Sequence, residues 1–224
     1  MQSLISSQEQ KKLLQIFNLN FRRGNFYLSL NDQEFSSSEI ILVEGQSGTG
    51  KSTFFDLLCG FEQPSSGDIV WQGSSLANKA PQDRPISIQL QGNSLFSGLS
   101  VEKNLLLAMH DFPMRRSEKS IKVHALIHSL KLPATVLAKK PSALSGGELL
   151  RANIARALLR RKPILILDEP FASLDATTAA AVAKYIEEYT RKYSILTFVS
   201  DHGDIAKKYL SITKYTQFML PLRS

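Results

Sequence analysis

Short apolar runs alternate along the chain with stretches in which apolar residues recur about every 3.6 positions. The runs at 40–44 (IILVE), 86–90 (ISIQL), 164–168 (ILILD) and 195–199 (ILTFV) are nearly continuous in apolar side chains, as strands buried on both faces are. A weaker strand pattern lies at 69–71. This alternation predicts an α/β fold in which helices cover a mostly parallel sheet.

Helices are predicted after Lys51 and over 101–110, 117–131, 147–161 and 176–192. Residues 91–163 form a mostly helical connection between two predicted strands, far longer than an ordinary crossover of about a dozen residues. We therefore predict one domain over 1–224, with a core of about 1–91 and 157–224 and an inserted helical subdomain at about 92–156.

Composition narrows the class of protein. The chain has 224 residues, 43% of them hydrophobic and 21% charged, which fits a packed domain and excludes disordered and collagenous proteins. Its apolar runs are shorter than the roughly 20 residues that span a bilayer. Cys59 is the single cysteine, so no internal disulfide forms. We expect a soluble, cytoplasmic protein.

The net charge of +7 is spread along the chain, with one local concentration of basic residues at 111–140. A solvated helical face is the favoured interpretation of that concentration, and a surface facing anionic lipid or an acidic partner is the alternative.

A phosphate-binding loop follows the first apolar strand. The motif G-x-x-x-x-G-K-[ST] is filled by Gly45, Gln46, Ser47, Gly48, Thr49, Gly50, Lys51 and Ser52. Glycines let backbone N–H groups turn toward phosphate oxygens, and the following helix adds its positive dipole end. Lys51 is predicted to reach the β- and γ-phosphates, and the Ser52 hydroxyl to ligate Mg²⁺.

An acidic pair ends the strand at 164–168. Asp168 and Glu169 emerge at its carboxyl end, where open α/β sheets bind ligands. We predict that Asp168 holds Mg²⁺ and that Glu169 is the general base toward water.

A second candidate anion site precedes the amphipathic helix. In the run Leu144-Ser145-Gly146-Gly147-Glu148, Ser145 is a good N-cap, and the two glycines leave N–H groups open to an anion. Taken alone, this pentapeptide would be an ordinary helix cap.

Together these motifs resemble the ATP-binding cassette (ABC) family, specifically the stand-alone nucleotide-binding subunit of a transporter. GQSGTGKST, through Thr53, matches its phosphate loop, LSGGE is similar to its signature LSGGQ, and ILILDEP matches its acidic strand. Gln91 falls where the family has a Gln loop that touches metal and water, and Ala172-Ser173-Leu174-Asp175 looks like its partner-contacting loop. The resemblance covers nearly the whole chain.

The resemblance implies a P-loop NTPase with an N-terminal antiparallel β subdomain and an inserted α-helical subdomain. It implies ATP and Mg²⁺ as ligands, and a homodimer or cassette heterodimer in which Ser145, Gly146 and Gly147 close over the partner's γ-phosphate. It also implies a separate integral membrane permease, a substrate-binding protein as a further candidate partner, and a location on the inner face of the cell membrane. No nucleic acid is expected.

Two departures from the family pattern leave alternatives open. The family has a His after the last core strand, where straight alignment places Asp201. Either His202 serves after a one-residue shift, which we favour, or the switch is degenerate and turnover is slow, because an ionised carboxylate repels phosphate. Phe21 is the first candidate for stacking on adenine and Tyr27 the second, with core packing as the alternative for both.

Three functions are weighed. The favoured one is an ATP-hydrolysing subunit that energises transport of a small molecule, and importers are the nearer resemblance. The second is a soluble ABC ATPase acting on ribosomes or nucleic acid, and the third is a nucleotide-gated clamp whose turnover has decayed. The transported substrate does not follow from this sequence.

Overall fold

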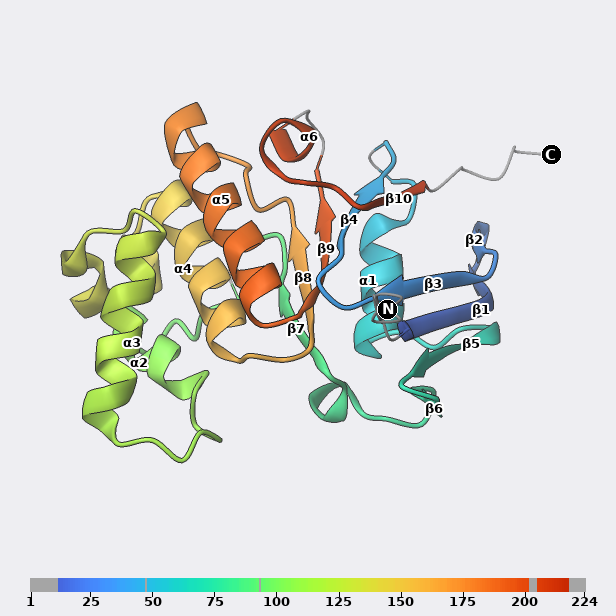
Figure 1. Ribbon diagram of the computed structural model, residues 1–224, viewed down its shortest axis with the longest axis horizontal. Helices are drawn as coiled ribbons and strands as arrows, with labels where there is room; N and C mark the ends of the chain where they lie inside the picture. The colour runs from blue at the N-terminus through green and yellow to red at the C-terminus, as the bar shows by residue number, and fades with distance from the viewer. Residues whose placement is uncertain (1–11, 47, 93, 202–204, 218–224) are drawn as a thin grey trace, which may run out of the picture.

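The computed structural model describes residues 12–46, 48–92, 94–201 and 205–217. A parallel sheet forms its centre, in the strand order β10-β4-β9-β8-β7. Its strands are β4 (Ile40–Glu44), β7 (Ile86–Gln89), β8 (Ile164–Asp168), β9 (Leu196–Ser200) and β10 (Lys214–Gln217). The antiparallel sheet lies beside α1, and the other helices lie on the opposite side of the parallel sheet (Figure 1).

The antiparallel sheet has the order β2-β1-β5-β6, with β3 also paired to β1. Its strands are β1 (Lys12–Arg23), β2 (Phe26–Leu30), β3 (Gln33–Ser36), β5 (Ser66–Trp71) and β6 (Ser74–Ser75). The predicted fold class, with its antiparallel β subdomain, is confirmed.

Helices α1 to α5 agree with the predicted ones within a few residues, whereas α6 and the 3₁₀ turns were not predicted. They are α1 (Lys51–Cys59), α2 (Val101–Leu107), α3 (Arg116–Ser129), α4 (Gly146–Leu159), α5 (Ala176–Lys192) and α6 (Ile205–Tyr209), with 3₁₀ turns η1 (Pro81–Asp83), η2 (Ala134–Ala138) and η3 (Pro141–Ala143). α4 runs unbroken through residue 156, where the helical subdomain was predicted to end. The division into core and helical subdomain stays a prediction.

Two apolar clusters cover the two faces of the parallel sheet. Leu42, Leu165 and Val199 pack on the side of α2–α6, whereas Ile166 and Phe198 pack on the side of α1 and the antiparallel sheet. Burial on both faces is the reason that these strands read as continuous apolar runs.

The register of the sheet brings the carboxyl ends of four strands to one edge. Ser200 at the end of β9 pairs with Val43 of β4 on one side and with Asp168 of β8 on the other, and Gln89 of β7 pairs with Leu167. Loops that leave these strands therefore start side by side, at the edge where open α/β sheets place their ligands.

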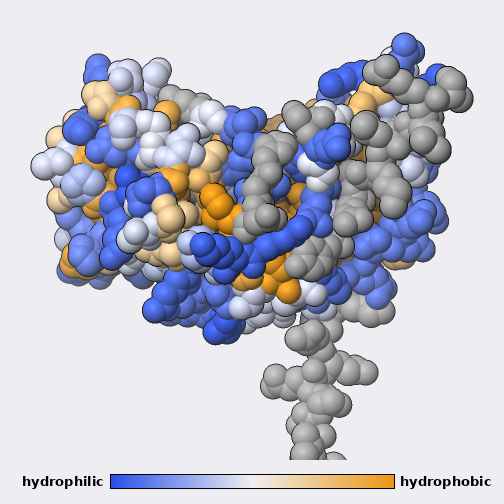
Figure 2. All heavy atoms as spheres, turned by 90° about the horizontal axis from the view of Figure 1, so that it is seen from above, coloured by the Kyte–Doolittle hydropathy of each residue, from blue (hydrophilic) through white to orange (hydrophobic). Residues whose placement is uncertain are grey.

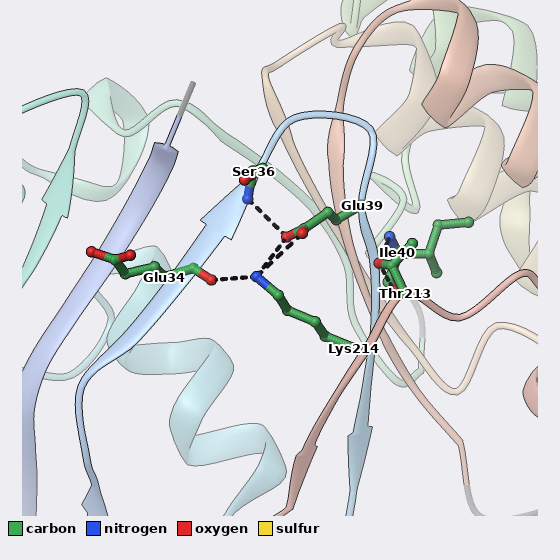
Figure 3. Close-up of polar contacts among 6 residues, drawn as sticks. All are labelled: Glu34, Ser36, Glu39, Ile40, Thr213 and Lys214. Atoms are coloured by element: carbon green, nitrogen blue, oxygen red, sulfur yellow. Dashed lines mark hydrogen bonds and ion pairs between the residues drawn. The ribbon is translucent and has the colours of Figure 1, made fainter. Parts of the chain in front are cut away.

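A polar cluster around the buried Glu39 links the antiparallel sheet to the parallel one (Figure 3). Glu39, 9% exposed, accepts a hydrogen bond from the backbone N–H of Ser36 at 2.8 Å. Its carboxylate also lies 3.2 Å from Nζ of Lys214, which donates to the Glu34 carbonyl at 2.7 Å. Lys214 of β10 thus holds the turn between β3 and β4.

A buried arginine closes the far end of α1. Arg84, 2% exposed, donates from its guanidinium to the carbonyls of Leu57 and Leu58, each at 2.7 Å, and to that of Lys79 at 3.2 Å. A cation there satisfies carbonyls that a helix end leaves unpaired and complements the negative end of its dipole.

None of the helices within the described ranges is long and apolar enough to cross a membrane. Hydrophilic residues cover most of the described surface in the view of Figure 2, and hydrophobic colour gathers toward its middle.

Candidate nucleotide site

A cleft of about 390 Å³ lies at the carboxyl edge of the parallel sheet. It brings together residues from the phosphate loop, the acidic strand, the Gln loop and the antiparallel sheet. The lining residues are Arg23, Phe26, Gly48, Gly50, Lys51, Ser52, Thr53, Gln91, Asp168 and Glu169. The predicted Lys51, Ser52, Thr53, Gln91, Asp168 and Glu169 therefore share one cavity.

The phosphate loop leaves the first turn of α1 without a side-chain cap. Its N-cap is Gly50, with φ of +103°, so the cap residue carries no side chain that could accept from the first N–H groups. A Cβ on Gly50 would lie 2.9 Å from Leu28 Cδ1 and 3.0 Å from Phe26 Cζ. By contrast, Ser100, Ser145 and Asp175 cap α2, α4 and α5 with their own side chains. The free donors of α1 fit an anion such as a phosphate group.

Lys51 is 6% exposed, and its side chain forms hydrogen bonds to the loop that precedes it. Its Nζ donates to the carbonyls of Gly45 at 2.6 Å and Gln46 at 3.1 Å. The Thr49 hydroxyl donates to the same Gln46 carbonyl at 2.8 Å, which closes the loop. Burial lowers the pKa of Lys51 below its ordinary value, and the carboxylates of Glu169 and Asp168 oppose that shift.

Asp168 is held by the strand next to it. Its Oδ1 accepts from the Ser200 hydroxyl at 2.5 Å, and the residue is 5% exposed. Asp168 and Ser52 both line the cleft, and they offer the hard oxygen ligands that Mg²⁺ prefers. The described ranges hold no cluster of three His, Cys, Asp or Glu side chains suited to a metal. One carboxylate and one hydroxyl at the cleft suit Mg²⁺, which is usually held by one or two carboxylates together with substrate phosphates.

Glu169 follows with a backbone φ of +53°, a conformation that L-residues seldom adopt. Its N–H donates to Ser200 Oγ at 3.0 Å, and its Oε2 accepts from Gln91 Nε2 at 3.1 Å. The structure thus joins two residues that are 78 positions apart in the sequence.

The signature segment begins α4 and lies outside the lining of this cleft. Ser145 Oγ accepts from the Glu148 N–H at 3.3 Å, and Glu148 Oε2 accepts from the Ser145 N–H at 2.9 Å, which is a capping box. This backbone hydrogen bond lowers the pKa of Glu148. A Cβ on Gly147 would lie 3.3 Å from the Ser173 carbonyl, so the signature abuts the Ala172–Asp175 loop.

The aromatic side chain at the cleft is Phe26, not Phe21. Phe21 is 4% exposed because it faces the core beneath β1, and its ring packs edge-on against Phe26 at 6.3 Å. Tyr27 is 41% exposed, donates its hydroxyl to Asn20 Oδ1 at 2.6 Å and does not line the cleft. Phe21 thus does not line the described cleft, and its stacking on adenine stays a prediction.

Asp201 accepts a hydrogen bond from the Ala206 N–H of α6 at 2.8 Å. His202 and Ser47, two predicted site residues, lie outside the described residues. The alternative between Asp201 and His202 at the switch position stays open.

Several site residues were not predicted from the sequence. Arg23 and Phe26 belong to strands that alternate in polarity, so their place at the cleft depends on how the two sheets pack. Ser200 and Gln89 contact the acidic pair. One indication of such a role was visible in the sequence, because each is a polar residue in a largely apolar strand.

Comparison with known proteins identifies the family that shares this arrangement. The profile of the ABC transporter family matches residues 30–172. The thiamine import ATP-binding protein ThiQ of Photorhabdus laumondii is 31% identical over 85% of this chain and 80% of that protein, and ThiQ of Haemophilus influenzae strain Rd is 38% identical over 73% and 75%.

Solved structures share the fold. The dimeric bacterial ABC transporter cassette MJ0796 superposes with a TM-score of 0.79 at 21% identity, covering 94% of this chain and 97% of that one. CbiO1 of Clostridium perfringens gives a TM-score of 0.76 at 25% identity, covering 93% and 87%.

The chain belongs to the ABC transporter family. It is an ATP-binding and ATP-hydrolysing subunit of a transporter, and the favoured function is confirmed over a soluble ATPase that acts on ribosomes or nucleic acid.

Proposed function

We propose that this chain pairs with a second cassette and hydrolyses ATP to drive import of a small organic molecule through a separate membrane permease. The carrying observation is the cleft, which holds Lys51, Ser52, Asp168 and Glu169 but excludes the signature segment of its own chain. A signature supplied by a second cassette completes the site, so hydrolysis requires the dimer.

The phosphate loop binds the triphosphate. The N–H groups in the first turn of α1 donate hydrogen bonds to phosphate oxygens. The ammonium group of Lys51 leaves the loop carbonyls and binds the β- and γ-phosphates. Phe26 packs against the nucleotide base, and Arg23 lies beside it on the same wall of the cleft.

Ser52 and Asp168 would hold Mg²⁺, with Gln91 close by. When bound, the ion neutralises charge that develops on the phosphate oxygens.

Glu169 polarises the attacking water. The water oxygen bonds to the γ-phosphorus, the bond to the bridging oxygen of ADP breaks, and the water proton passes toward the Glu169 carboxylate. Gln91 orients that carboxylate through its 3.1 Å hydrogen bond. The N–H groups of Ser145, Gly146 and Gly147 from the second cassette stabilise charge on the γ-phosphate.

Thiamine is the first candidate substrate, because the relatives named above are thiamine import proteins. The permease carries the selectivity, a substrate-binding protein delivers the molecule, and this chain sits on the inner face of the membrane. Its core and helical subdomain are divided near residues 92 and 156.

The test has two readouts in the host organism. A strain lacking this chain is complemented with the wild type, Glu169→Gln or the matched control Glu188→Gln, whose carboxylate on α5 is 60% exposed. Uptake of labelled thiamine should return with the wild type and the control only. Tagged Glu169→Gln, captured from solubilised membranes with ATP, should bring down a multi-span protein in stoichiometric amount.

The two readouts separate the parts of the proposal. Capture of the multi-span protein without any change in thiamine uptake would refute thiamine as the substrate and support the function as a transporter subunit. Capture of soluble proteins alone would refute the permease.

A further inference from the structure

Gln89 is a buried polar residue at the end of β7, two positions before Gln91. Its exposure is 0%, and the run ISIQL that contains it is otherwise mostly apolar. Neither the phosphate loop nor the signature explains an amide at this position.

The amide makes two hydrogen bonds with one nitrogen. Its Nε2 donates first to the Asp168 carbonyl at 3.1 Å and second to the Leu90 carbonyl at 2.8 Å. Both partners can only accept, so the NH₂ group must point toward them. Its Oε1 is buried and has no hydrogen-bond partner within the described residues. A buried acceptor without a partner is unfavourable, so the two donated bonds must offset it.

The first bond fixes the peptide group that joins Asp168 to Glu169. Gln89 holds its carbonyl, and Ser200 Oγ holds its N–H at 3.0 Å. The φ of +53° at Glu169 is the torsion about the N–Cα bond that leaves this peptide group. Because an L-residue in that region needs support from its surroundings, both ends of the peptide are tied to neighbouring strands.

The second bond fixes the peptide group that precedes Gln91, through the Leu90 carbonyl. Gln91 and Glu169 in turn join each other through Nε2 and Oε2 at 3.1 Å. One buried amide therefore holds the two backbone positions from which this pair extends.

We propose that Gln89 is a positioning residue for ATP hydrolysis, which fixes the direction of Glu169 relative to Gln91 without touching nucleotide. The inference rests on the proposed role of Glu169 in polarising water. It predicts that losing the amide impairs turnover and leaves ATP binding intact.

The test replaces Gln89 by Met, which keeps the length of the side chain and removes its donors. With the purified full chain and saturating MgATP, kcat should fall about tenfold, because small misplacements of reacting groups have large effects on rate. The KM for ATP should stay within about twofold, and the melting temperature should not fall.

Two further variants define the reading of that result. Thr216→Val is the matched control, since Thr216 is also buried and its Oγ1 also lacks a partner within the described residues, and its kcat should be unchanged. Gln89→Asn keeps a shorter amide that cannot reach both carbonyls, and its kcat should lie between those of the wild type and Gln89→Met.

Ser200→Ala supplies a coupling test. Because Gln89 and Ser200 hold the same peptide group, Gln89→Met should lower kcat less in a Ser200→Ala background than in the wild type. Fully independent effects of the two substitutions on kcat would contradict the inference that Gln89 and Ser200 act on the same peptide group.

The outcomes are distinguishable. If Glu169→Gln abolishes hydrolysis while Gln89→Met keeps the wild-type kcat, or raises KM as much as it lowers kcat, this inference fails and the proposed function stands. If Glu169→Gln hydrolyses ATP at the wild-type rate, the proposed role of Glu169 fails, and the inference fails with it.

Discussion

Gln91 donates its side-chain amide to the carboxylate of Glu169 across 3.1 Å, from the end of one strand to the end of its neighbour. This hydrogen bond fixes the direction of the Glu169 carboxylate, because the amide N–H₂ can only donate and the carboxylate oxygen accepts. The geometry thus pairs the candidate base with Gln91, which falls where the family has its Gln loop.

Replacing Glu169 by Gln should reduce phosphate release by about 100-fold or more, because an amide cannot accept the water proton. Nucleotide binding should persist, since Lys51 and the α1 N-terminus are unchanged. Phosphate release and equilibrium binding of labelled ATP check the two effects separately. Residual hydrolysis above a tenth of the wild-type rate would rule out the assigned role.

Replacing Glu148 by Gln should remove an acid-dependent part of the stability. The pKa of Glu148 lies below its ordinary value of 4.5, chiefly because the Ser145 N–H donates to the carboxylate. That stabilisation is present in full above the ordinary value and is lost as the pH falls through the lowered pKa. Urea unfolding of both proteins between pH 7 and pH 3 should show a difference that shrinks with acid, and a constant difference would contradict it.

Replacing Lys214 by Met should destabilise the fold by about 1–2 kcal/mol, because it leaves the buried Glu39 carboxylate without its cation. Adding Glu39→Gln should recover part of that loss, since a neutral amide oxygen still accepts from the Ser36 N–H. A double-mutant cycle of unfolding free energies measures the coupling. Additive effects of the two changes would show that the contact in Figure 3 contributes nothing to stability.

The thiol of Cys59 should resist modification in the folded protein. Burial, together with the nearby Asp56, raises its pKa to about 12, so little thiolate forms at pH 8, while Arg84 acts in the opposite direction. A disulfide reagent should label the native chain slowly and the urea-unfolded chain at once. Fast native labelling would mean that the end of α1 opens readily.

The continuous apolar strands could be predicted from the sequence because burial on both faces makes them readable. The strand at 164–168 and the helix at 176–192 have the predicted bounds. β1 was harder to predict, since buried Leu14, Ile16 and Leu19 are interrupted by exposed Phe17 and Asn18 where its register with β5 shifts. β10 was missed because it is a short strand at one side of the sheet.

The chemistry of the cleft followed from motifs, whereas its walls did not. Lys51 and Asp168 belong to local patterns whose spacing reflects one strand, one loop and one helix. The place of Phe26 at the cleft depends on which side of β1 and β2 faces the core, and the contacts of Gln89 and Ser200 depend on strand register. Such contacts arise between distant segments, so no local pattern specifies them.

Arg84 gives the nucleotide cleft a second, remote support. The nine residues of α1 form a rod of about 14 Å, gripped at its far end by a guanidinium just before β7. β7 then returns to the cleft and ends beside the acidic pair. Both ends of α1 are therefore connected to the same edge of the sheet, the first turn directly at the cleft and the last turn through Arg84 and β7.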